Sequence, residues 1–145
     1  MSSFGDSAFA SFSNLKELRL ARSDVQNAVD SGAFDNIPQT IDTLDLSGSN
    51  LRQVPRSVLA NTPQLAQINL ATNEISSLST GDFPDNNQLL SVDLSGNPIS
   101  YINAGALQSL KSVERLLLKQ STLKSIDLSE QTPNAGARFS TQHTI

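Results

Sequence analysis

A short alternation of hydrophobic and polar residues, LLSVDLSGNPISYI at 89–102, stops at an asparagine. Residues 92–95 alternate with the period of two that predicts one half-buried strand, and residues 96–98 predict a turn. Ile99 and Ile102 then resume the hydrophobic pattern. Because so short a strand is not stable alone, the pattern predicts neighbouring strands of the same kind.

Four further segments repeat this pattern at a nearly constant spacing. They are LKELRLARSDVQ from Leu15, TIDTLDLSGSNLRQV at 40–54, LAQINLATNEISSL at 65–78 and VERLLLKQSTLKSI at 113–126. Successive copies are 26, 24, 24 and 24 residues apart, counted between their first hydrophobic positions, Leu15, Ile41, Leu65, Leu89 and Val113. A regular period of this length indicates stacked repeats whose hydrophobic positions form continuous buried columns.

Each copy has the form L-x-x-L-x-L-x-x-N-x-L, and over residues 15–128 the chain resembles the leucine-rich repeat family. The resemblance implies an α/β fold, a curved right-handed solenoid with a parallel sheet on its concave face. Short helical, 3₁₀ or irregular segments are implied on the convex face. The 24-residue spacing is similar to that of the class found in extracellular receptors, adhesion proteins and matrix proteins, Toll-like receptors among them.

The asparagine position has a structural role in such an array. A buried amide at the end of each strand can bond to backbone groups that the turn leaves without partners. Asn73 and Asn97 fit this role, while serines with fewer hydrogen-bonding groups occupy the same position in the other copies, Ser23, Ser49 and Ser121. We therefore expect fewer side-chain hydrogen bonds in those three copies.

Both ends of the chain depart from the repeat. Phe9 precedes Leu15 by six residues, just as Phe83 precedes Leu89 and Leu107 precedes Val113. Residues 1–14 are thus interpreted as the returning half of a truncated repeat, the half that leads from the end of one strand back to the start of the next. Residues 129–145 are interpreted as a polar, disordered tail. Between them, 15–128 hold five repeats, starting at 15, 41, 65, 89 and 113. We expect a piece of a longer array; the alternative is a short complete protein that self-associates through its uncapped ends.

Composition and charge argue against several classes of function. The 145-residue chain is 37% hydrophobic and 17% charged, which suits one folded domain, and it contains no hydrophobic run long enough to span a membrane. A net charge of -4 without a dense Lys/Arg cluster argues against nucleic acid as a partner and against an anionic membrane surface. The absence of cysteine excludes disulfides and thiolate metal sites, but it does not assign a compartment.

The residues that catalytic sites require are missing from the sequence. Its single histidine, His143, lies in the predicted tail, and no phosphate-binding, dinucleotide-binding or zinc-hydrolase motif occurs. Asp45 and Asp93 share a strand position, but two strand spacings separate them by roughly 9 to 10 Å, too far for one small cation. We expect no catalytic residue, no metal site and no cofactor.

The outward positions of the predicted strands form a candidate binding face. Alternation sends Leu18 and Leu20 into the core and their neighbours outward. The middle of the face is small, polar and mildly acidic, so we expect a protein or peptide that is basic at its centre. Leu117 is a plainly hydrophobic outward residue and a candidate contact anchor. The candidate partner-binding residues are Glu17, Arg19, Arg22, Thr43, Asp45, Gln67, Asn69, Ser91, Asp93, Arg115, Leu117 and Lys119.

The resemblance favours a non-enzymatic protein-recognition module within an extracellular receptor, adhesion or matrix protein, with immunity among the implied roles. An extracellular or cell-surface location follows if the chain belongs to a longer protein of that kind. Two alternatives stay open: an intracellular regulatory or adaptor subunit, and a structural spacer with no partner of its own.

Overall fold

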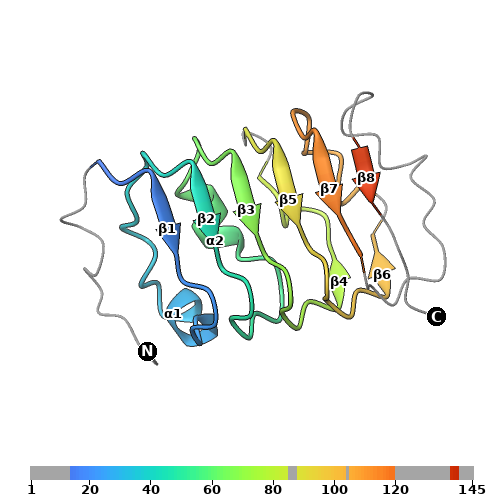
Figure 1. Cartoon of the computed structure of the whole chain (residues 1–145), viewed down its shortest axis with the longest axis horizontal. Helices are drawn as coiled ribbons and strands as arrows, with labels where there is room; N and C mark the ends of the chain where they lie inside the picture. The colour runs from blue at the N-terminus through green and yellow to red at the C-terminus, as the bar shows by residue number, and fades with distance from the viewer. Residues whose placement is uncertain (1–13, 85–87, 104, 120–137, 141–145) are drawn as a thin grey trace.

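The main sheet is built from strands of three residues that recur along the chain. The computed structural model describes residues 14–84, 88–103, 105–119 and 138–140. All neighbouring strands pair in parallel, in the order of the chain (Figure 1). The strands are β1 (Glu17–Arg19), β2 (Thr43–Asp45), β3 (Gln67–Asn69), β5 (Ser91–Asp93), β7 (Arg115–Leu117) and β8 (Arg138–Ser140). The chain is therefore a parallel-sheet solenoid.

The central residues of the strands form the first column of a continuous core. Leu44 lies opposite both Leu18 and Ile68, and Val92 lies opposite both Ile68 and Leu116. Leu18 is partly buried, and the others are at most 3% exposed. A second column follows two residues further along each strand: Leu20, Leu46, Leu70, Leu94 and Leu118. Stacking of the repeats removes these side chains from water, as the period predicts.

The returning halves of the repeats form the outer side of the solenoid. The first two contain helices α1 (Gln26–Asp30) and α2 (Arg56–Ala60), and the next two contain strands β4 (Ser77–Leu78) and β6 (Tyr101–Ile102). The two strands pair in parallel as a second sheet (Figure 1), which the sequence pattern does not predict. Repeats of equal length bring these returning backbones into register, so their N–H and C=O groups bond across the repeats.

An ion pair ties two repeats together on the outer side. Asp82 is only 2% exposed, and its Oδ1 lies 3.0 Å from Nε of Arg56 on α2. Its Oδ2 accepts the N–H of Ser79 at 2.8 Å. The buried carboxylate thus has both a cation and a backbone donor, as a buried charge requires.

The last described segment extends the main sheet beyond the fifth repeat. Strand β8 pairs in parallel with β7, whose edge otherwise offers unpaired N–H and C=O groups. These three residues lie within 129–145, the segment that the sequence predicts to be a disordered tail, and their backbone continues the sheet. The rest of that tail and residues 1–13 lie outside the described residues.

Side chains of one repeat hold the turn of the repeat before it. The amide of Asn73 is 7% exposed and donates from Nδ2 to the carbonyl oxygens of Leu46 and Leu70, both at 3.0 Å. Its Oδ1 accepts the N–H groups of Ser49 at 2.8 Å and Leu51 at 3.0 Å. One side chain therefore satisfies backbone groups in two successive repeats. We call this series of hydrogen bonds from the asparagine position of each repeat the ladder.

The ladder continues at Asn97 and becomes thinner toward the first repeat. Asn97 donates to the carbonyl oxygens of Leu70 and Leu94 at 2.9 Å and accepts the N–H of Ile75 at 3.0 Å. Ser49 has a single hydroxyl, which lies 3.1 Å from the carbonyl oxygen of Leu20. At the equivalent position of the first repeat, the N–H of Ser23 donates to Leu20 O at 3.3 Å; Ser121 lies outside the described residues.

The residue before each of the four described ladder positions adopts a left-handed backbone conformation. Gly48 has φ 62° and Gly96 has φ 73°, but Arg22 and Thr72 occupy the same position with φ 60° and 58°. Glycine adopts these angles without strain, whereas a side chain, especially a β-branched one, crowds the backbone there. Thr72 is therefore a strained position of the array.

We expect Asn73→Ala to lower the free energy of unfolding by about 2 to 4 kcal/mol, because the buried N–H groups of Ser49 and Leu51 lose their acceptor. Ser49→Ala removes one hydroxyl and should lower it by about 1 kcal/mol. Urea denaturation followed by circular dichroism measures both values. Equal losses in the two variants would contradict a ladder that depends on asparagine.

Thr72→Gly should raise the free energy of unfolding by about 1 kcal/mol, because relief of the left-handed strain exceeds the entropy that glycine loses. Gly96→Ala is the opposite change at the equivalent position. A Cβ there would lie 3.2 Å from Oγ1 of Thr72 at φ 73°, so this variant should be less stable. Thermal unfolding of both variants measures the effect, and a lower midpoint for Thr72→Gly would refute the assignment of strain.

Candidate functional site

The concave face of the main sheet carries a shallow hollow of about 270 Å³. Outward side chains from β1, β2, β3, β5 and β7 line this concave hollow, so each of these five main-sheet strands contributes to it. From the predicted face the structure brings together Arg19, Thr43, Asp45, Gln67, Asn69, Ser91, Asp93, Arg115 and Leu117. Strict parallel register is what places these separate segments side by side.

Three residues of the predicted face do not line the hollow. Glu17 forms an ion pair with Arg19, and both side chains are exposed at the N-terminal end of the sheet. Arg22 lies in the left-handed turn after β1, and Lys119 is exposed beyond the end of β7. The sequence pattern misses two residues of the lining, Leu44 and Ile68, because alternation assigns their buried side chains to the core.

The polar centre of the hollow is held by hydrogen bonds to the chain itself. In each of Asp45, Asn69 and Asp93, Oδ1 accepts the N–H of the residue two positions further along, at 3.0, 2.9 and 2.9 Å. Asp45 also accepts the hydroxyl of Ser47 at 2.7 Å. These bonds fix half-buried side chains on neighbouring strands, so the centre of the face is ordered before any partner binds.

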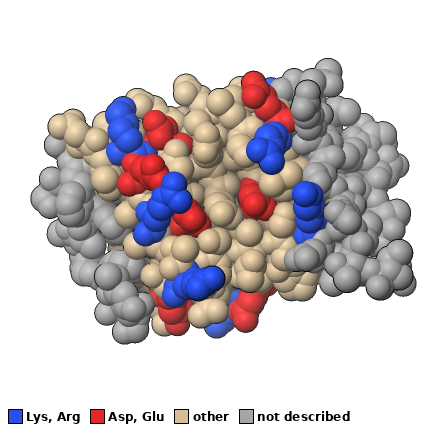
Figure 2. All heavy atoms as spheres, viewed as in Figure 1, with Lys and Arg blue, Asp and Glu red and all other residues tan. Residues whose placement is uncertain are grey.

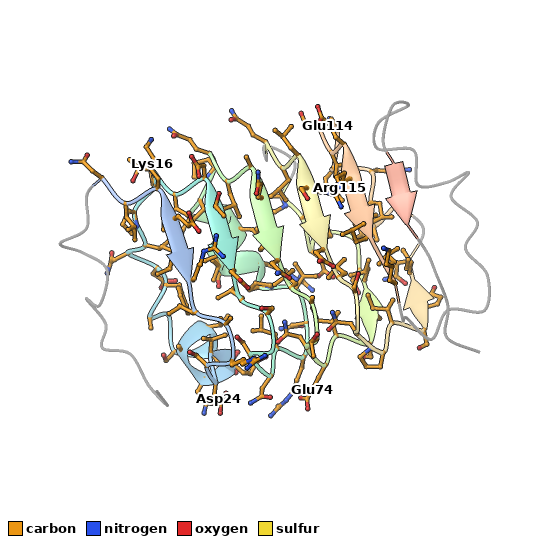
Figure 3. All side chains as sticks on the ribbon, in the orientation of Figure 1. Lys16, Asp24, Glu74, Glu114 and Arg115 are labelled. Atoms are coloured by element: carbon orange, nitrogen blue, oxygen red, sulfur yellow. The ribbon has the colours of Figure 1, made fainter. Side chains whose placement is uncertain are left out.

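The two ends of the hollow differ in charge pairing. Arg19 at the β1 end is neutralised by Glu17, whereas Arg115 at the β7 end has no side-chain ion pair or hydrogen bond with another described residue. Figure 2 shows acidic groups near the middle of this face and basic groups on both sides. Figure 3 places Arg115 over β7, apart from Glu114 at the edge where the strands begin. The hollow is thus acidic at its centre and basic at its β7 end.

The described residues contain no arrangement of groups typical of a metal centre. No three His, Cys, Asp or Glu side chains come together among them, and His143 lies outside the described residues. None of the helices in the described part of the chain has the length and hydrophobicity of a membrane span.

Comparison with known sequences identifies a family. The family model described as Leucine rich repeat matches residues 39–99 and 63–123, together more than half of the chain. Leucine-rich repeat and fibronectin type-III domain-containing protein 4 of Rattus norvegicus and that of Mus musculus are each 38% identical to the chain over 71 residues. These residues are 49% of this chain but 11% of the relatives, so the chain spans a small part of their length.

Solved structures show the same architecture. The leucine-rich repeat domain of APL1 is 28% identical, with a TM-score of 0.73 over 92% of this chain and 35% of that one. The Drosophila Toll–Spatzle complex (18% identical, TM-score 0.71, 99% of this chain, 23% of that one) and the TLR13–ssRNA13 complex (19%, 0.65, 92% and 22%) share the fold alone. The chain belongs to the leucine-rich repeat family.

Proposed function

We propose that the chain is a non-enzymatic recognition module that binds a protein or peptide in the concave hollow. The observation that carries this proposal is the hollow itself, a shallow surface lined by outward polar side chains from five strands. Sites for small molecules are more enclosed and more hydrophobic, whereas shallow polar faces with a few fixed groups suit protein partners. The ordered centre supports recognition because little side-chain entropy is lost on binding.

A protein partner fits the charges of the hollow better than a nucleic acid does. The fold by itself does not distinguish the two, since TLR13 has been solved in a complex with ssRNA13. Asp45 and Asp93 lie at the centre of the face, where phosphate groups would be repelled. The net charge of -4 acts in the same direction at long range.

The role of the module in a longer protein is proposed from its relatives. The solved neighbours include Toll bound to Spatzle, described as a hub in development and innate immunity, and the sequence relatives combine leucine-rich repeats with fibronectin type-III domains. We place the chain in receptor-type recognition outside the cell, with its concave face as the binding surface.

A bulky residue at the centre of the hollow should block binding. Peptides selected from a random displayed library on the wild-type chain are the probe, and Ser91→Trp should weaken their binding by about tenfold or more, because the indole fills the space that a partner would occupy. Ser57→Trp is the matched control, since Ser57 lies on α2 on the outer side. Fluorescence polarisation with labelled peptides measures each affinity.

The comparison of the two tryptophan variants tests the location of binding. Loss of peptide binding in Ser91→Trp together with wild-type affinity in Ser57→Trp supports the concave hollow as the binding site. Loss with Ser57→Trp alone places recognition on the outer side and overturns the proposal. A library that yields no peptide above the level bound by the empty support also overturns it.

A further inference from the structure

Two carboxylates face the hollow with half of their hydrogen-bonding capacity unused. In Asp45 and Asp93, Oδ1 is bonded within its own segment, while Oδ2 has no hydrogen bond with another described residue. Between them on β3, Asn69 makes the same Oδ1 bond without a charge. Two strand spacings separate the carboxylates by roughly 9 to 10 Å, so a long basic side chain fits between them.

The β7 end of the hollow has the opposite charge. The exposed guanidinium of Arg115 lacks a partner among the described residues, and the partly buried Leu117 adjoins it on the same strand. Arg115 lies one strand beyond Asp93, yet no ion pair joins them within 4.0 Å. An acidic group from outside is therefore the natural partner of Arg115, and a carboxylate can engage it with two parallel hydrogen bonds.

We infer that the concave hollow binds an extended polypeptide segment that carries a basic side chain followed closely by an acidic one. The segment crosses the strands, with its basic side chain between Asp45 and Asp93 and its acidic side chain on Arg115, and an adjacent hydrophobic group contacts Leu117. Arg115 lies two strands across from Asn69 on β3 and two residues earlier in the strand register, so the two positions are roughly 12 Å apart, which an extended chain covers in about three or four residues. This inference rests on the proposed function and names the chemistry of its partner.

Charge complementarity makes the pattern specific. A segment with basic groups alone would bring a cation against Arg115, and one with acidic groups alone would meet Asp45 and Asp93. Juxtaposed like charges oppose binding and well-placed opposite charges favour it, so the hollow discriminates by sign and position.

To test this inference, peptides are selected from a random displayed library on three forms of the chain, and the selected peptides are sequenced. On the wild type we expect a Lys or Arg with an Asp or Glu about three or four residues away. On the double variant Asp45→Asn/Asp93→Asn, the selected peptides should lose their preference for a basic residue and keep their preference for an acidic one. On Arg115→Gln they should lose the preference for an acidic residue and keep the preference for a basic one. Asparagine keeps the Oδ1 acceptor, as Asn69 shows, so the double variant removes charge and leaves the local bonds intact.

Direct binding then tests the order of the charges. A wild-type peptide with its basic and acidic residues exchanged should bind about tenfold more weakly. Arg52→Gln is the control, because Arg52 is exposed and does not line the hollow; its peptide pool should match that of the wild type.

Three outcomes separate this inference from the proposed function. If the selected peptides lack the charge pair but Ser91→Trp still blocks their binding, the inference is overturned and the proposed function stands. If Ser91→Trp does not block binding of the selected peptides, whether or not they carry the charge pair, both the inference and the proposed function are overturned. A single-stranded RNA oligonucleotide that displaces the peptides from the wild type, but not from the Arg115→Gln variant, would also overturn the inference, because phosphate would then be the ligand of Arg115.

Discussion

The ladder is the constraint on which the rest of the structure depends. After β2, β3 and β5 the chain leaves the main sheet, and the N–H and C=O groups of these turns would otherwise be buried without partners. Asn73 satisfies groups of its own turn and of the turn before it, through bonds to Leu46, Leu70, Ser49 and Leu51. Because this one side chain serves two repeats, the second and third repeats must stack at a fixed offset. The 24-residue register of β2, β3, β5 and β7 follows from this requirement.

Fixed register turns a sequence pattern into columns of side chains in space. Every second residue of a strand enters the core, and the residues between them align across five strands into one face. The concave hollow is thus a consequence of stacking, and most residues of its lining occupy the outward positions of the strands. The outer side is less regular, because helices α1 and α2 and strands β4 and β6 all satisfy the returning backbone. The concave face is accordingly the better-defined surface for a partner.

Much of this arrangement could be predicted from the sequence, and what could not has a physical reason. The period gives the strands, the core columns and most of the lining of the hollow, because all depend on positions within one repeat. The second sheet, the pairing of β8 and the neutralisation of Arg19 by Glu17 depend on contacts that the pattern does not contain. The sequence position of Arg22 predicts a place on the face, but Arg22 lies in a left-handed turn after β1 and does not line the hollow.

The charges at the centre of the hollow are not a requirement of the fold. The turn after each strand needs only the Oδ1 acceptor, and Asn69 supplies it at 2.9 Å as well as Asp93 does. Asp45 and Asp93 therefore add negative charge to a half-buried face where a neutral amide would serve the same local bond, and their mutual repulsion gives the folded chain no benefit. Arg115 likewise stands without a partner among the described residues. The stability of the solenoid explains the hydrogen bonds of this face but not its charges, and the charges are what a complementary partner would recognise.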